Sequence, residues 1–178
     1  MNMLRLFAVL SLICGVLYPL AVTGLAQLLF AHQSQGSLIT RNGVVVGSSL
    51  LAQKFSSPQF FSARPSAANY ATVSSGATQA SPTHKAAMTA RLERQHALPH
   101  AGVDGWTTSG SGLDPHISPE TARAQLPRVA AARGLTEDAL KPLILAHTET
   151  ETWGIWGRPR VNVLALNLAL DARGKDDK

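Results

Sequence analysis

The longest apolar stretch of the chain runs from Leu6 to Phe30 and contains no aspartate, glutamate, lysine or arginine. A helix rises about 1.5 Å per residue, so a helix over this stretch exceeds the ~30 Å hydrocarbon thickness of a bilayer. A secretory signal has a shorter apolar core of about 7–15 residues. We therefore predict a retained transmembrane helix over residues 6–30, preceded by a short N-terminal segment, residues 1–5.

Five positions within this predicted span are candidates for contact with a partner helix. Small residues allow close helix approach, and a polar side chain can hydrogen-bond across helices or reach the headgroups. Proline removes a backbone donor and is expected to kink the helix. The candidate partner-contact residues are Gly15, Tyr18, Pro19, Gly24 and Gln27.

The charges that flank the span bear on its orientation. Arg5 precedes the span, whereas the first positive side chain after it is Arg41, some distance away. Positive charge close to a span favours the cytoplasmic side. The pattern predicts a cytoplasmic N-terminus and an extracytoplasmic main domain.

Beyond the span, short apolar runs predict a compact domain of mixed helix and strand, an α/β (α+β) fold, over residues 31–171. Two β-prone runs flank Asn42-Gly43, the strongest short hairpin signal. The large residues alternate over 161–168, as in a strand, although the part after Leu166 would also suit a helix. We expect residues 172–178 to form a flexible polar tail.

Three helices are predicted from their end signals. Ser81-Pro82 is expected to begin a helix that runs to about Ala97. Ser118-Pro119-Glu120 begins a second helix, which reaches Arg133 with Gly134 at its C-terminus and carries Pro127 as a possible bend. Thr136 caps a third helix that runs to about Thr148.

Composition excludes several function classes. The formal net charge is +5, but the basic residues are dispersed and no nucleic-acid-binding signature is present, so we expect no nucleic-acid partner. Cys14 is the only cysteine, so no intramolecular disulfide can form. The sequence has no phosphate loop, no nucleophile elbow and no zinc-binding helix motif. The six histidines have no metal-ligand spacing, and we predict no metal site.

The segment from Ser109 to Pro119 concentrates polar chemistry in a few residues: Ser109, Ser111, Asp114 and His116. A hydrolase would use Ser111 as nucleophile and His116 as base, but local clustering does not supply the orientation that catalysis needs. A structural turn would use Asp114 to bind nearby amides and Pro115 to stiffen the chain. A loop that docks onto a partner or ligand is the third possibility. We predict no catalytic residue.

Several motifs occur in a fixed order along nearly the whole chain. They are Gly15-Val-Leu-Tyr-Pro-Leu20, Gly36-Ser-Leu-Ile39, Phe60-Phe-Ser-Ala-Arg-Pro-Ser-Ala67, Ser109 to Pro119, Arg128-Val-Ala130, and Arg160-Val-Asn-Val-Leu-Ala-Leu-Asn167. Together they resemble the KdpC family, the small accessory subunit of the bacterial high-affinity potassium-transporting P-type ATPase. The stretches 75–82 and 103–107 depart from the usual family pattern.

The resemblance implies a complex in the bacterial inner (plasma) membrane. Its other members would be a channel-like potassium-translocating subunit, a P-type ATPase catalytic subunit and a very small membrane subunit. The family's subunit stabilises this assembly without hydrolysing ATP, and a role in raising the pump's nucleotide affinity has been proposed for it. ATP would then be a ligand of the complex, because an extracytoplasmic domain cannot reach cytoplasmic ATP. The alternatives are a membrane-anchored exported hydrolase using Ser111 and His116, and a free-standing anchored binding protein.

Overall fold

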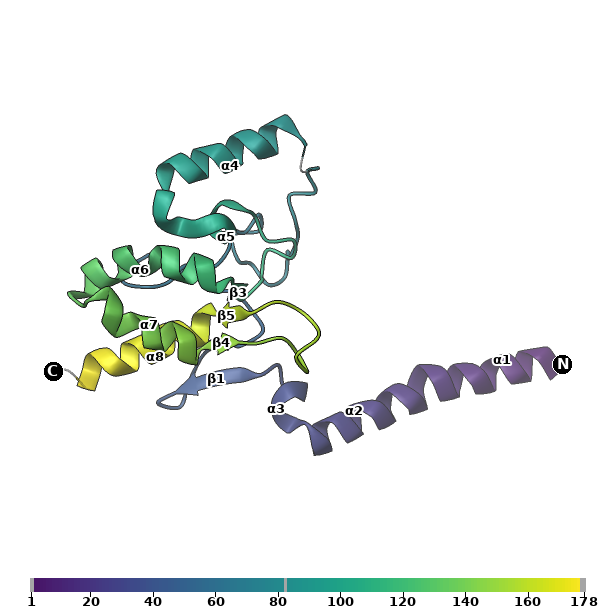
Figure 1. Ribbon diagram of the computed structural model, residues 1–178. Helices are drawn as coiled ribbons and strands as arrows, with labels where there is room; N and C mark the ends of the chain where they lie inside the picture. The colour runs from purple at the N-terminus through teal and green to yellow at the C-terminus, as the bar shows by residue number, and fades with distance from the viewer. Residues whose placement is uncertain (1, 82, 177–178) are drawn as a thin grey trace. The chain divides into compact units, whose positions relative to one another are not determined.

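The computed structural model describes residues 2–81 and 83–176 and divides into two compact units. The first unit ends at Ser48, and the second begins at Ser49. Figure 1 shows the helices and strands of both units along the chain. Helix and sheet are both present, which confirms the expected mixed fold class.

The first unit begins with a continuous apolar helix, Asn2–Leu29, whose most apolar 18-residue window has a mean hydropathy of 2.2. It consists of α1 (Asn2–Leu12), a π-helical turn η1 (Ile13–Leu17) and α2 (Tyr18–Leu29). The short helix α3 (Ala31–Ser34) follows. By length and composition Asn2–Leu29 is able to cross a membrane, and we call it the anchor helix.

The π-helical turn ends at Leu17, two residues before Pro19, where we expected a kink. The Tyr18 N–H bonds to the Ile13 carbonyl, five residues back, so the turn is wider than an α-helical one. Proline cannot donate a hydrogen bond, and its ring crowds the carbonyl one turn earlier. The wider turn accommodates both effects, and such turns are a common cause of helix kinks.

A β-hairpin completes the first unit and confirms the Asn-Gly prediction. Strands β1 (Leu38–Arg41) and β2 (Val44–Ser48) pair antiparallel, with Arg41 opposite Val44. The two turn residues, Asn42 and Gly43, have φ of 52° and 76°. Positive φ at both central positions is the property that makes Asn-Gly favourable in a type I′ turn.

The second unit places helices around a small antiparallel sheet with strand order β3-β5-β4. The strands are β3 (His116–Ile117), β4 (Thr148–Glu149) and β5 (Arg160–Asn162). The helices are α4 (Lys85–Ala97), η2 (Pro99–Ala101), α5 (Gly102–Trp106), α6 (Pro119–Arg133), α7 (Glu137–Ala146) and α8 (Val163–Asp176).

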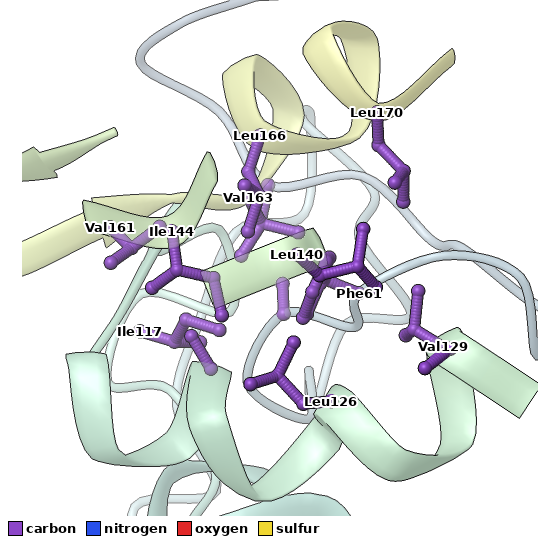
Figure 2. Close-up of a cluster of buried hydrophobic side chains, with 14 residues drawn as sticks. Phe61, Ile117, Leu126, Val129, Leu140, Ile144, Val161, Val163, Leu166 and Leu170 are labelled. Carbon is purple, nitrogen blue, oxygen red and sulfur yellow. The ribbon is translucent and has the colours of Figure 1, made fainter. Parts of the chain in front are cut away.

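The hydrophobic core of this unit lies between the sheet, α6, α7 and α8. Figure 2 shows Leu126 and Val129 of α6 and Leu166 of α8 directed into the same interior as Leu140 of α7. Phe61, which belongs to no helix or strand, is completely buried within this cluster. An irregular segment therefore supplies one of the largest core side chains.

The end signals of α6 and α7 are confirmed. The Ser118 hydroxyl accepts from the Thr121 N–H, and Gly134 ends α6 with a left-handed φ of 68°. Pro127 lies inside α6 without splitting it. The Thr136 side chain caps α7, which ends at Ala146, slightly before the expected Thr148.

The predicted start of α4 is wrong. The helix begins at Lys85 with His84 as its N-cap residue. The Ser81 hydroxyl instead accepts from Thr83 N–H at 3.4 Å, and the Ser81 carbonyl accepts from His84 N–H at 2.9 Å. Ser81 therefore belongs to a turn before the helix, and Pro82 lies outside the described residues.

The predicted strand over 161–168 is correct only at its start, because β5 ends at Asn162 and α8 follows at once. The Asn162 Oδ1 accepts from Ala165 N–H at 3.1 Å and so caps the helix. Val163, Leu166, Asn167 and Leu170 are buried, which is helical rather than strand spacing.

The end of α8 also differs from expectation. We expected a tail over 172–178, but α8 continues to Asp176, and residues 177–178 lie outside the described part. The Arg173 guanidinium donates to the Ala139 carbonyl at 2.7 Å, so the last part of α8 is joined to α7.

Candidate functional site

Two segments that are far apart in the sequence meet at the candidate site, Arg64–Ala67 and Ser109–His116. We call these two segments the polar junction. Ser109 N–H donates to the Pro65 carbonyl at 2.9 Å. The Arg64 guanidinium lies 3.3 Å from Asp114 Oδ2 and also donates to the carbonyls of Thr107 and Thr108.

Both oxygens of the Asp114 carboxylate are engaged within the chain. Oδ1 accepts from the His116 backbone N–H at 3.0 Å, and Oδ2 receives Arg64. The His116 ring Nδ1 lies 3.7 Å from Oδ1. The nearby His116 side chain, together with the His116 amide and the Arg64 charge, lowers the pKa of Asp114 against the opposing effect of burial. The expected bond from Asp114 to a nearby amide is confirmed.

The two serines of the junction hold the backbone of the loop. The buried Ser109 hydroxyl accepts from the N–H groups of Gly112 and Asp114, at 3.1 and 3.3 Å. Ser111 Oγ accepts from Leu113 N–H at 3.1 Å. Within the described residues no hydrogen bond joins Ser111 to His116, and the imidazole lies beside Asp114 instead. The arrangement lacks the nucleophile–base contact that a hydrolase needs.

A cavity of about 490 Å³ opens beside the junction. Its lining comprises Leu50, Leu51, Ser75, Ser109, Gly110, Ser111, Leu113, Asp114 and Pro115. The amides of Gly112, Leu113 and Asp114 already bind serine hydroxyls, so this loop does not present the row of unpaired amides that a phosphate cradle uses. The described residues contain no group of three or more potential metal ligands.

Gly112 is where the junction meets the stretch that departs from the family pattern. Its φ is +73°, and an added Cβ would lie 2.9 Å from the Gly76 carbonyl oxygen and 3.0 Å from Ser66 Oγ. The Ser75 hydroxyl donates to the Ser111 carbonyl at 2.7 Å. The 75–76 segment therefore packs directly on the junction, and only glycine fits at 112 without strain.

Polar side chains of α6 and α8 hold the irregular segment 58–62, which precedes Arg64, and our sequence interpretation missed them. We call Gln125, Arg128 and Asn167 the polar framework. Asn167 of α8 is buried, and its amide bonds to both the N–H and the carbonyl of Phe61, each at 2.9 Å. The Gln125 side-chain amide of α6 likewise accepts from the Ser62 N–H at 2.8 Å and donates to the Ser62 carbonyl at 3.1 Å. The side chains thereby supply the hydrogen bonds that a neighbouring strand would otherwise make.

Arg128 of α6 extends this framework. Its guanidinium donates to the carbonyls of Pro58 and Phe60 at 2.7 and 2.9 Å and to Gln125 Oε1 at 2.9 Å. Burial lowers the pKa of this guanidinium. The only sequence signal for the framework is a polar residue at a core position of α6 or α8, as at Gln125 and Asn167.

The candidate partner-contact residues of the anchor helix are all exposed. Gly15 lies in η1, whereas Tyr18, Pro19, Gly24 and Gln27 lie in α2. An added Cβ at Gly15 or Gly24 would meet no atom within 4 Å. Their role in partner contact stays a prediction.

Comparison with known proteins gives a consistent result over nearly the full length. Residues 1–172 match the family described as KdpC, K⁺-transporting ATPase, c chain. Proteins named potassium-transporting ATPase KdpC subunit are 50% identical over 170 residues in Cereibacter sphaeroides, covering 93% of this chain and 92% of the relative. The corresponding protein of Geobacter sulfurreducens is 49% identical over 173 residues, covering 92% of each chain. That of Herminiimonas arsenicoxydans is 48% identical over 180 residues, covering 94% of each.

Proposed function

Because this chain belongs to the KdpC family of K⁺-transporting ATPase c chains, we propose that it is a non-catalytic accessory subunit that stabilises an ATP-driven potassium-uptake complex. Its partners in this proposal are a channel-like potassium-translocating subunit, a P-type ATPase catalytic subunit and a very small membrane subunit. The anchor helix lies in the inner membrane, with the N-terminus in the cytoplasm and the second unit outside.

The observation that carries the proposal is the match of residues 1–172, which includes the anchor helix and the second unit as far as residue 172. The geometry is compatible with it, because the polar motif residues are used to build the domain. Asp114 and Ser109 bind the loop's own backbone, and Asn167 holds Phe61. Because these side chains are already hydrogen-bonded within the chain, they suit a structural role in a subunit better than chemistry on a substrate.

The anchor helix is the part of the proposal that can be tested most sharply. Gly24 and Gln27 are three residues apart in α2 and share one face. Since an added Cβ at Gly24 meets nothing within the chain, Gly24→Leu leaves the chain itself unstrained. Single interhelical contacts in membranes are worth on the order of 1 kcal/mol, so the variant should lower recovery of the partner subunits about fivefold.

The control is Val22→Leu, which also adds bulk to the exposed surface of α2 but two residues away, on a different face. Both variants would be purified in mild detergent through a C-terminal tag, and the partner subunits quantified. Equal recovery with Gly24→Leu and Val22→Leu would contradict packing through Gly24.

A role in nucleotide affinity is proposed only as an effect transmitted through the pump subunit. The amides of the polar junction that a phosphate would need are already paired. Purified complex with and without this chain should therefore differ in its apparent KM for ATP, whereas the chain alone should not bind ATP. Binding of ATP to the isolated full-length chain would contradict this indirect route.

The exported-hydrolase alternative predicts that Ser111→Ala abolishes function, whereas the accessory-subunit proposal predicts no effect. Ser111→Ala removes the bond to Leu113 N–H but no group that the accessory function requires. Growth under potassium limitation and complex ATPase activity should therefore stay at the wild-type level. Loss of growth with intact assembly would favour a chemical role for Ser111.

A further inference from the structure

The loop between β4 and β5 exposes an unusual concentration of large apolar side chains. Trp153, Ile155 and Trp156 are 87%, 77% and 68% exposed. Every residue from 152 to 159 is exposed. Figure 1 shows this loop extending beyond the ends of β4 and β5. We call residues 152–157 the tryptophan tip.

The tip is a tight turn whose backbone is poorly suited to tryptophan. Ile155 N–H donates to the Thr152 carbonyl at 3.3 Å, and the two central residues, Trp153 and Gly154, have φ of 57° and 70°. This is the pattern of a type I′ turn, in which asparagine is favoured at the first central position. A bulky residue with positive φ is strained. Such strain together with exposure is typical of a contact surface rather than of a structural element.

We propose that the tryptophan tip inserts into the interfacial region of the membrane, among the phospholipid headgroups. Tryptophan is enriched at this depth because its ring is apolar while its N–H remains polar. The exposed Arg158 follows the tip and suits the phosphate groups of lipids. The inference rests on the proposed function in one respect, because it takes Asn2–Leu29 as a membrane anchor.

Chain length favours lipid as the occupant. The stretch from Leu29 to Ser49 would span about 70 Å if fully extended, but it is folded into α3 and the β1–β2 hairpin, so it tethers the second unit to the anchor helix by less than that distance. A stable protein–protein interface uses about 20–30 residues on each side, whereas the tip offers three apolar side chains. A tethered domain needs only a small additional contact to orient itself on a lipid surface.

The test uses the full-length chain reconstituted in vesicles of equimolar phosphatidylcholine and phosphatidylglycerol. The chain has three tryptophans, so the variant Trp106→Phe leaves Trp153 and Trp156 as the only reporters. Brominated lipids quench tryptophan that touches them. We expect strong quenching by bromines near the headgroups and weaker quenching by bromines near the bilayer centre. Emission that is equal in brominated and unbrominated vesicles would overturn the proposal.

A second variant separates membrane contact from folding. Trp153→Asn places the favoured residue in the turn, so its thermal unfolding temperature should equal or exceed that of the wild type, while bromine quenching falls because one of the two tip tryptophans is removed. This comparison uses the native Trp106 and remains informative if Trp106→Phe does not fold. If the variant's quenching is unchanged, the tip does not touch lipid.

A third outcome assigns the tip to a different partner. If the tip is not quenched in vesicles and Trp153→Asn lowers recovery of the other pump subunits, the tip binds protein and the lipid proposal is wrong. Failure of the accessory function would appear differently, as absence of those subunits from purifications of the wild-type chain.

Discussion

The substitution Asn167→Leu tests the polar framework that holds the irregular segment against the core. Asn167 is 2% exposed and Phe61 is fully buried, so water cannot replace the two bonds between them. Leucine has a similar size but leaves the Phe61 N–H and carbonyl unpaired. Each unpaired buried group costs about 1–3 kcal/mol, so the free energy of unfolding should fall by about 2–6 kcal/mol. That is a large part of the ~5–15 kcal/mol typical of a domain.

The assay is denaturant or thermal unfolding of the full-length chain in mild detergent. For domains of this size class 1 kcal/mol corresponds to a change of roughly 2–8 °C in Tm, so the expected decrease is easily measured. Lys54→Ala is the control, because it removes an exposed hydrogen bond to Asn69 and should change stability by no more than about 0.5 kcal/mol. A wild-type Tm for Asn167→Leu would refute the conclusion that the two hydrogen bonds between Asn167 and Phe61 stabilise the fold.

The polar junction gives two further predictions. Gly112→Ala should lower the free energy of unfolding by about 2 kcal/mol or more, because residue 112 combines a positive φ with a close approach to the Gly76 carbonyl. Gly110→Ala is the control, since an added Cβ there meets nothing within 4 Å and the variant should unfold like the wild type. Equal unfolding temperatures for the two variants would contradict the packing of Gly112 against Gly76. Asp114 has a lowered pKa in the folded chain, so the unfolded chain binds more protons, and the stabilisation present above the ordinary value of 3.8 is lost as pH falls through the folded value. Asp114→Asn should therefore flatten the loss of stability below about pH 4 in unfolding measurements, and an unchanged acid slope would contradict it.

Local signals in the sequence were sufficient for several elements. The hairpin follows from Asn42-Gly43, because that pair alone favours the positive φ values the turn requires. The ends of α6 follow from Ser118 and Gly134, whose capping roles depend on neighbouring backbone only. These features are predictable because the interactions that decide them span a few residues.

Other elements depend on contacts that are distant in the sequence. Alternating leucines favoured a strand over 161–168, but the buried set of α8 includes Asn167, a polar residue that a hydrophobic pattern leaves out. Its burial is acceptable only because Phe61 supplies both hydrogen-bond partners. Ser81 had the sequence of a helix cap, yet its hydroxyl binds Thr83 in a preceding turn.

In the candidate site too, the local contacts could be predicted from the sequence and the long-range contacts could not. That Asp114 binds a neighbouring amide was predictable, since aspartate followed by proline favours such turns. The ion pair between Arg64 and Asp114 and the bond from Ser109 to Pro65 join residues that are 50 and 44 positions apart, and no spacing rule reveals them. The resemblance grouped the two motifs, and the structure gives the physical reason for their occurrence together.

The central claim is that this chain works as a subunit of a potassium-transporting ATPase, and affinity purification tests it most directly. The chain would carry a C-terminal tag and be purified from gently solubilised membranes of potassium-starved cells. We predict recovery of a P-type ATPase subunit and a channel-like subunit, with potassium-stimulated ATPase activity in the eluate. Recovery of this chain alone, from membranes in which the pump subunits are present, would contradict the claim.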